Sequence, residues 1–387
     1  MLITGCASSD DASSGDAGTS GSGAATDEFV LYASLGLSGP SSAFATAVDA
    51  GIGAAVTTIN DNGGLLGRQV RVDVENNESV PTTGVSKLQN RLRDDKPDLV
   101  WAGSTSAETL PMLALTTREK MIALNNGSAP EIGDASTFPY SFSAGVGNVA
   151  QANFILNELK AKGYKNVGIL TASGAFGEAL SKQYQETFQA AGLTVIPESY
   201  EPDAVEMDGP LARINDANPD VVVFNDFVHP AYVLKSRVKV GMADVPFIGD
   251  ISTTLNDLSG TVSTEEKDGV LLSSYKVQTT AADRPGVTNL LATLKENNVT
   301  VSSGLYLYAL AYDTVLAYAN AAEAIGSTDV DAVRAAMEEG KGDKYQLSLT
   351  DSIGWTPETH IGSGQDENLF TLIPVSPMVS GQFQLAS

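Results

Sequence analysis

The stretch FVLYASLGLSGPSSAFATAVDAGIGAAVTTINDNGGLLGRQVRVDVE, residues 29–75, contains one whole cycle of strand, helix and strand. Residues 29–33 form a short apolar run, which predicts a strand. The apolar residues that follow recur at the spacing of one helix face: Val48, Ile52, Ala55, Val56 and Ile59. We expect this helix to end at the turn signal NDNGG, residues 60–64, before valines alternate at 70, 72 and 74 as in a second strand. Such a cycle is the unit of a parallel sheet covered by helices.

The same cycle recurs along the 387 residues of the chain. Further strands are expected near 98–102, 121–124, 166–171, 194–197, 221–225 and 246–249, a return strand near 269–275, and late helices at 304–325 and 329–339. These are more strands than one sheet comfortably holds, and the length suits two domains. We therefore predict an α/β fold of two Rossmann-like lobes, whose parallel sheets are flanked by helices and which a three-segment hinge joins. Lobe 1 is expected at 28–143 plus 273–349, and lobe 2 at 144–272 plus 350–387.

The charge and the rare residue types exclude several classes of function. A formal net charge of −24 argues against a nucleic-acid partner and against docking on anionic lipid, since both need a basic face. His229 and His360 lie too far apart to begin a metal-ligand motif, and Cys6 is the only cysteine. No apolar run near the length of a membrane span stands out. The sequence thus predicts no metal, no cofactor and no internal disulfide.

The N-terminal segment 1–27 has the composition of a membrane tether. Ile3-Thr4-Gly5-Cys6 resembles the lipobox of bacterial lipoproteins, in which the cysteine carries the lipid, although the basic and apolar regions that usually precede the box are missing. Residues 7–27 are almost wholly small or polar, so they cannot bury enough surface to order themselves. We expect a truncated signal, lipidation at Cys6, a disordered spacer, and membrane contact through the lipid anchor only. The body would then lie outside the cell membrane or in the periplasm.

Hydroxyl and amide residues follow three of the predicted strands, in the loops at 36–44, 102–109 and 125–130. In open α/β sheets, ligands bind beyond the carboxyl ends of the strands, where free backbone N–H groups gather. Each loop taken alone also suits an ordinary helix cap or turn. Three of them at equivalent strand ends predict a binding site for a carboxylate or a similar small polar ligand.

No catalytic motif accompanies these loops. The sequence contains no G-x-S-x-G elbow, no G-x-G-x-x-G and no P-loop, and the glycines of 63–67 follow a helix rather than a strand. We therefore predict a binding protein and not an enzyme.

The order and spacing of several short motifs are more specific than any one of them. They are Ser38-Gly39-Pro40, Gly51, Ile59-Asn60, Gly63-Gly64, Gly67-Arg68, Gly103-Ser104-Thr105-Ser106, Phe176-Gly177-Glu178, Asn218-Pro219-Asp220 and Tyr308-Ala309-Leu310-Ala311-Tyr312-Asp313. From residue 29 onward, the chain resembles the leucine/isoleucine/valine-binding protein family, the substrate-binding components of ABC importers. The resemblance implies a monomeric extracytoplasmic binding protein that closes two lobes on a small molecule and delivers it to a permease.

The resemblance also implies a set of ligand-binding residues. The carboxylate of an amino-acid ligand would be held by Ser106, with Thr105 adjacent. The next loop would add backbone and side-chain groups of Asn126, Gly127 and Ser128. Aromatic walls of the pocket would be Phe44, Phe176 and Phe227.

Two departures widen the choice of ligand. The family usually has tyrosines at the places of Phe44 and Phe176, which are equally suited to a core. The acidic partner of the ligand ammonium is replaced by Ile251, with Asp250 one residue earlier, and Asp226 could substitute for it; both acids also suit helix caps. A branched-chain or other amino acid, a small carboxylate or amide, and an aromatic acid all stay open.

Two other functions remain as alternatives. A sensor ectodomain of the same fold would pass its closure to a signalling partner rather than to a permease. A secreted amidase-like hydrolase would turn over a bound amide.

Overall fold

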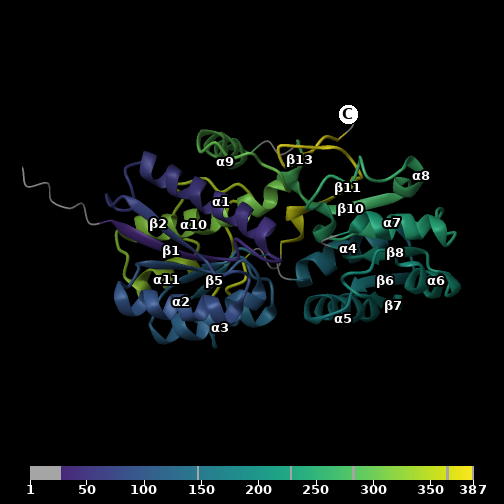
Figure 1. Ribbon diagram of the computed structural model, residues 1–387, viewed down its shortest axis with the longest axis horizontal. Helices are drawn as coiled ribbons and strands as arrows, with labels where there is room; N and C mark the ends of the chain where they lie inside the picture. Colours follow the sequence, from purple (N-terminus) through teal and green to yellow (C-terminus); the bar gives the residue numbers. More distant parts are fainter. Residues whose placement is uncertain (1–27, 146–147, 227–228, 281–283, 363–365, 386–387) are drawn as a thin grey trace, which may run out of the picture.

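The computed structural model describes residues 28–145, 148–226, 229–280, 284–362 and 366–385 (Figure 1). Two sheets, each flanked by helices, lie side by side and give the molecule an elongated shape with two lobes. The predicted fold class, an α/β fold of two largely parallel sheets, is confirmed. The tether and Cys6 lie outside the described residues.

The first sheet is fully parallel and has the strand order β2-β1-β3-β4-β5. Its strands are β1 (Phe29–Leu35), β2 (Val70–Asn76), β3 (Leu99–Ala102), β4 (Ala123–Asn125) and β5 (Ser141–Ser143). Helices α1 (Ser42–Asp61), α2 (Pro81–Asp94) and α3 (Ser106–Arg118) connect the first four strands, and the 3-10 helix η1 (Pro130–Gly133) precedes β5. Strand β1 begins the cycle predicted from 29–75 and pairs with β2 from Phe29 opposite Val70.

The second sheet has the order β11-β10-β9-β8-β6-β7, and only its edge strand β11 runs antiparallel. Its strands are β6 (Asn166–Ala172), β7 (Thr194–Tyr200), β8 (Val221–Phe224), β9 (Phe247–Gly249), β10 (Val270–Tyr275) and β11 (Phe370–Pro374). The accompanying helices are α4 (Asn148–Lys162), α5 (Ala175–Ala190), α6 (Asp208–Asp216), α7 (Pro230–Lys239), η2 (Ile251–Thr254) and α8 (Thr264–Lys267).

The remaining elements follow β10 in the chain. They are η3 (Lys276–Gln278), α9 (Pro285–Glu296), α10 (Leu305–Ile325), α11 (Val330–Glu338), η4 (Glu367–Leu369), and the short hairpin of β12 (Met378–Val379) and β13 (Gln382–Phe383). Helices α9 and α10 pack against α1, so the chain returns from the second sheet to cover the first.

Helices α1 and α10 make the largest helix contact of the first lobe. Helix α1 has the length and composition of a membrane span, so the expectation that no apolar run approaches that length was wrong. Its residues Val48, Ile52 and Ala55 are fully buried in the core cluster of the first lobe. It is therefore the core helix of a lobe, and its apolar face covers the sheet and α10.

Three passages join the two lobes. The chain leaves the first sheet after Ser143, returns after Tyr275, and leaves again after residues 359–361, which form bridges to Asp134 and Ser143 of the first lobe. Strand β10 stays in the second sheet as far as Tyr275, and residues 359–361 lie against the first lobe. The exact residues at which the chain passes from one lobe to the other therefore stay predictions.

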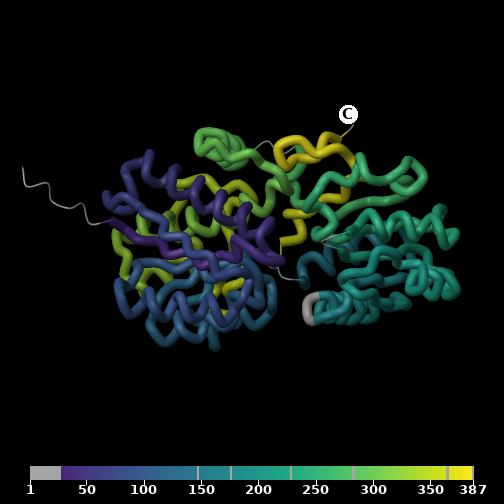
Figure 2. Tube along the Cα trace, in the orientation of Figure 1, coloured from purple at the N-terminus to yellow at the C-terminus, as the bar shows by residue number. Residues whose placement is uncertain are grey.

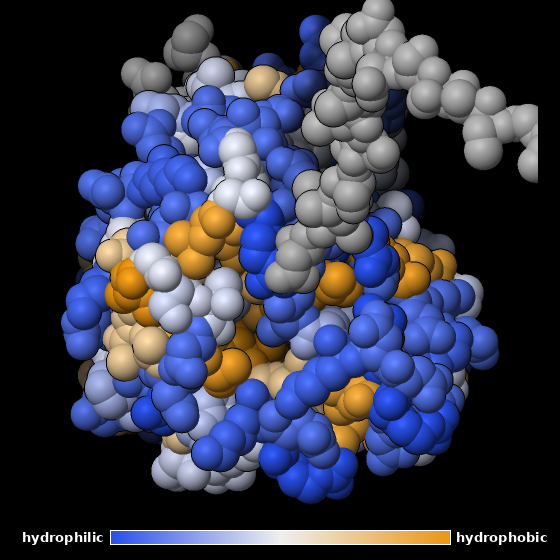
Figure 3. Space-filling model, turned by 90° about the vertical axis from the view of Figure 1, so that its left-hand side faces the viewer, coloured by the Kyte–Doolittle hydropathy of each residue, from blue (hydrophilic) through white to orange (hydrophobic). Residues whose placement is uncertain are grey.

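Most predicted strands are present within a few residues of their expected positions. Strand β5 (Ser141–Ser143) was not predicted, because three residues in a polar, apolar, polar order give little periodic signal. The surface of the outer end of the first lobe is mostly hydrophilic, with separate apolar areas between hydrophilic residues (Figure 3). The exposed large apolar residues of the described chain are valines: Val74, Val80, Val149, Val205 and Val379.

Candidate ligand-binding site

The carboxyl ends of the parallel strands of both sheets face the junction between the lobes. In Figure 2 the purple trace of β1 runs from the outer end of the first lobe toward the second, and the other strands of its sheet are parallel to it. In the second lobe, Ile251 and Leu255 follow β9 and pack against the core cluster of the first lobe. Tyr275, at the end of β10, stacks on Tyr306 of α10 with ring centroids 5.1 Å apart. The strand-end loops of the two lobes therefore lie at one junction.

A buried carboxylate, Glu108 on α3, holds the loops of the first lobe together. Its oxygens accept hydrogen bonds from the Ser104 backbone N–H at 3.0 Å, the Asn77 side chain at 3.0 Å and the Ser41 hydroxyl at 2.7 Å. Glu108 is 2% exposed. Three strand-end loops, those after β1, β2 and β3, thus share one carboxylate. Sequence reasoning missed this residue, although Thr105 followed by Glu108 three residues later is a helix-start signature.

Thr105 and Ser106, adjacent in the second loop, have different roles. The hydroxyl of Thr105 is the N-cap of α3: it accepts the Glu108 backbone N–H and donates to the Glu108 carboxylate at 3.3 Å. The hydroxyl of Ser106 instead accepts two backbone N–H groups, from Ser128 and Ala129, both at 3.2 Å. Two accepted bonds orient its own O–H away from those amides. Ser106 therefore offers a hydrogen-bond donor at the positive end of a helix.

The loop after β4 contains two asparagines with opposite environments. Asn125 is fully bonded within the protein, since its amide oxygen accepts from the Gly127 N–H at 3.0 Å and its nitrogen donates to Ser141 at 3.1 Å. Asn126 is 7% exposed, and neither polar atom of its side chain has a hydrogen-bond partner among the described residues. The Gly127 carbonyl accepts the Ser143 hydroxyl at 2.8 Å, which ties this loop to the end of β5.

The second lobe contributes a buried polar cluster after β8 and β9. Asp250 caps η2 through the Ser252 N–H at 3.0 Å and accepts from the Asn225 side chain at 2.8 Å. It is 1% exposed, and burial raises the pKa of its carboxyl to about 6, while the hydrogen bonds of Ser252 and Asn225 oppose that shift. Asp226 is 4% exposed and accepts the His229 N–H at 2.7 Å. Both acids thus accept hydrogen bonds from nearby backbone N–H groups, in agreement with the helix-cap interpretation of the sequence.

The predicted aromatic walls are described only in part. Phe44 lies on α1, half-buried against the core cluster of the first lobe. Phe176 belongs to the first turn of α5, but its side chain lies outside the described part of the structure. Phe227 lies outside the described residues altogether. The roles of these three residues stay predictions.

The structure therefore brings Ser106, Asn126, Gly127 and Ser128 together in the first lobe, and Asp226 and Asp250 together in the second. Sequence reasoning missed Asn225, which is 1% exposed and whose amide oxygen has no partner among the described residues. The sequence analysis placed it at the end of the strand predicted at 221–225, whereas the structure ends β8 at Phe224 and leaves Asn225 in the loop. In the part of the chain that the structure describes, no group of three or more His, Cys, Asp or Glu side chains could hold a metal ion.

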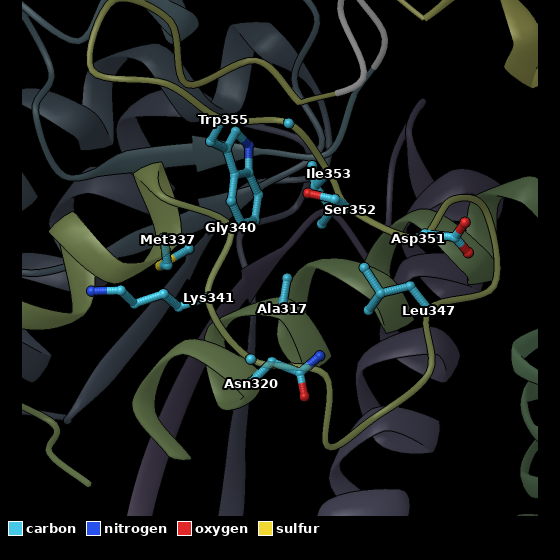
Figure 4. Close-up of a pocket in the computed structure, with 12 residues that line it drawn as sticks. Ala317, Asn320, Met337, Gly340, Lys341, Leu347, Asp351, Ser352, Ile353 and Trp355 are labelled. Carbon is cyan, nitrogen blue, oxygen red and sulfur yellow. The ribbon is translucent and has the colours of Figure 1, made fainter. Parts of the chain in front are cut away.

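A separate cavity lies away from these loops, in the first lobe between α10, α11 and residues 351–355 (Figure 4). Its empty volume is about 340 Å³, which includes space open to solvent. The amide of Asn320 on its wall is already paired with the backbone N–H and carbonyl of Tyr345, at 2.7 and 2.9 Å, and Lys341 pairs with Glu339 at 2.7 Å. With these polar groups partnered, the cavity is a weaker candidate for a ligand than the strand-end loops.

Residues 33–365 match the family described as periplasmic binding protein, over most of the chain. The chain belongs to the periplasmic binding protein family. Members of this family are solute-binding proteins rather than enzymes, which removes the hydrolase alternative, and the family implies an extracytoplasmic location.

Relatives of this periplasmic binding protein agree with that assignment. The Leu/Ile/Val-binding protein BraC3 of Rhizobium johnstonii is 24% identical over 318 residues, 79% of this chain and 82% of that protein. The branched-chain amino acid substrate-binding protein LivJ of Streptococcus pneumoniae, solved with isoleucine, has a TM-score of 0.71 at 20% identity, covering 92% of this chain and 98% of LivJ. A solute-binding protein of Rhodopseudomonas palustris BisB5, solved with 3,4-dihydroxybenzoic acid, has a TM-score of 0.70 at 18% identity, covering 87% of this chain and 90% of that protein.

Proposed function

We propose that this periplasmic binding protein is the solute receptor of an ABC importer, that it closes its two lobes on a small carboxylate, and that it delivers this ligand to a permease. The protein would act as a monomer, anchored to the outer face of the cell membrane through a lipid on Cys6. Ligand binding would shift the population from open to closed lobes, and the closed form would be the one that the permease reads.

The observation that carries this proposal is the arrangement around Ser106. Its hydroxyl accepts from the Ser128 and Ala129 N–H groups and so directs its own hydrogen elsewhere, at the N-terminus of the 13-residue helix α3. Free donors at the positive end of a helix favour an anion. Isoleucine and 3,4-dihydroxybenzoic acid, the ligands of two structural neighbours, share one group of this kind, a carboxylate.

The other expected contacts complete the proposed site. Ser128 would present its hydroxyl to the ligand and Asn126 its side chain, while the N–H groups of Gly127 and Ser128 hold the loop through their bonds to Asn125 and Ser106. Phe44, Phe176 and Phe227 would enclose the body of the ligand. Asp226 and Asp250 would act from the second lobe by shaping its loops.

A thermal-shift screen of amino acids, hydroxy acids, small amides and aromatic acids tests the proposal. A ligand at one hundred times its Kd adds about 2.7 kcal/mol of stability, which is readily measured. We expect carboxylates to raise the melting temperature, and Ser106→Ala to weaken the binding of each hit about tenfold. Ser86→Ala, on the exposed face of α2, serves as the matched control. Unchanged affinity in Ser106→Ala, or hits confined to compounds without a carboxylate, would contradict the proposal.

The importer role has a test of its own. Genes for permease and ATPase subunits beside the gene of this protein are expected for an importer, and the closed protein should stimulate that ATPase in reconstituted vesicles. A neighbouring histidine kinase or other signalling gene, with no permease, would favour the sensor ectodomain instead.

A further inference from the structure

Asn126 has the most exceptional polar side chain in the strand-end loops. Only 7% of its surface is exposed. Neither its amide nitrogen nor its amide oxygen has a hydrogen-bond partner among the described residues. Buried side-chain amides are usually bonded, because an unpaired one costs free energy. Its neighbour Asn125 follows that rule, with bonds to Gly127 and Ser141. The hydrogen bonds that hold this loop therefore do not account for the buried, unpaired amide of Asn126.

The place of Asn126 relates it to the anion site. It directly precedes Gly127, where an added Cβ would lie 3.4 Å from the Ser106 hydroxyl oxygen. The next two residues, Ser128 and Ala129, donate their N–H groups to that same hydroxyl. The unpaired amide thus belongs to a residue two and three positions before the backbone donors to the Ser106 hydroxyl, at the N-terminus of α3.

We propose that Asn126 determines ligand specificity, and that its side chain recognises an uncharged polar group on the ligand, a hydroxyl or a carboxamide, next to the carboxylate held at Ser106. This inference rests on the proposed function and adds the second polar group of the ligand to it. A side-chain amide offers both a donor and an acceptor. A hydroxyl or a carboxamide on the ligand can pair with the donor and with the acceptor of this amide. An ammonium has no acceptor and would leave the amide N–H unpaired. A second carboxylate has no donor, so its lone pairs would face those of the amide oxygen.

The second lobe agrees with an uncharged group. Asp250 is the acid nearest to the place expected for an ammonium partner, but it is 1% exposed and is bonded to Ser252 and Asn225. The position that follows it is Ile251, half-buried against the first lobe. Asn225 has an unpartnered amide oxygen within the described chain, which can accept the hydrogen of a ligand hydroxyl or amide.

Two pairs of probes that differ only in hydroxyl groups test the inference by calorimetry. They are 2-hydroxy-3-methylpentanoate against 3-methylpentanoate, and 3,4-dihydroxybenzoate against benzoate. We expect the wild-type protein to prefer the hydroxylated member of at least one pair by about tenfold, a typical effect of leaving a buried amide unpaired. Asn126→Ala is expected to abolish that preference while it binds the member without hydroxyl as tightly as the wild type does. Asn90→Ala, on the exposed face of α2, should leave the preference unchanged.

Each other outcome counts against the inference. A preference that survives in Asn126→Ala, or an equal loss of affinity for both members of a pair, would assign Asn126 a packing role. Equal wild-type affinity for both members would overturn the inference but leave the carboxylate site intact, provided that Ser106→Ala still weakens binding of all four acids. If none of the acids binds, the carboxylate ligand and the role of Asn126 are overturned together.

Discussion

The carboxylate of Glu108 accepts a hydrogen bond at 2.7 Å from the hydroxyl of Ser41, which lies 67 residues earlier in the chain. Through this bond and those to Ser104 and Asn77, one buried acid positions the loops that follow three adjacent strands. The Ser106 site lies at the start of the same helix, so its geometry depends on this acid.

Replacing Glu108 should weaken both the fold and the site. Glu108→Gln keeps the shape of the side chain, but one carboxylate oxygen becomes an amide nitrogen that cannot accept, so buried donors lose their partner. We expect a loss of about 2–4 kcal/mol in the free energy of unfolding, measured in urea, together with weaker ligand binding. Glu119→Gln, just after the same helix, removes only an exposed contact with Arg118 and should change stability by less than about 0.5 kcal/mol. Similar values for the two variants would contradict the central role of Glu108.

Two glycines on one helix should respond in opposite directions to the same substitution. A Cβ on Gly51 would clash with the Tyr308 carbonyl oxygen of α10, whereas a Cβ on Gly53 would meet no atom within 4 Å. We expect Gly51→Ala to destabilise the protein by about 1–3 kcal/mol through overpacking. Gly53→Ala should stabilise it by about 0.5–1 kcal/mol, because alanine restricts the unfolded chain and favours a helix. Thermal melts of the two variants measure the signs, and equal signs would refute the close contact of α1 with α10.

A buried acid on α10 should make stability fall as the pH rises. Asp313 is fully buried and accepts hydrogen bonds from the Ser348 N–H at 2.7 Å and the Leu349 N–H at 2.7 Å. Burial raises the pKa of its carboxyl to about 7, against these hydrogen bonds. Since this pKa lies above the unfolded value of 3.8, the folded state binds more protons, and stability present at about pH 4 is lost as the pH rises to about 7.

The variant Asp313→Asn isolates that effect, because asparagine cannot ionise. The free energy of unfolding of the variant relative to the wild type should rise between about pH 4.5 and about pH 8. Asp351→Asn, at a side chain that is 97% exposed, should show a nearly constant difference over the same range. A relative stability of Asp313→Asn that is flat or falls with pH would show that Asp313 is ionised in the folded protein throughout.

The second lobe depends on a buried guanidinium. Arg237 is 1% exposed, and it donates to backbone carbonyls that include Val245 at 2.8 Å and Asp268 at 2.9 Å. It therefore ties the segment before β9 to the end of α8. We expect Arg237→Lys to cost about 2–4 kcal/mol, since an ammonium cannot reach these carbonyls in the same fork. Arg213→Lys, at an exposed pair with Glu198, should cost less than about 1 kcal/mol in the same urea titration. A small effect at Arg237 would mean that water replaces its bonds.

Local sequence determined the elements and the class of fold. The apolar run of 29–33, the helical spacing from Val48 to Ile59 and the alternating valines at 70–74 each reflect a local period, and β1, α1 and β2 lie where those periods predicted them. The hydroxyl-rich start of α3 was also visible, because a helix cap depends on neighbours within one turn.

Only the tertiary structure decided which polar side chains are already hydrogen-bonded within the protein. The amides of Asn125 and Asn126 are identical in the sequence, yet the first is bonded to Ser141 and the second has no partner among the described residues. Likewise, nothing local marks Glu108 as the acid that Ser41 and Asn77 reach. Hydrogen bonds between loops that are tens of residues apart depend on how the strands are ordered in the sheet, and strand order is a property of the whole packed chain rather than of any one segment.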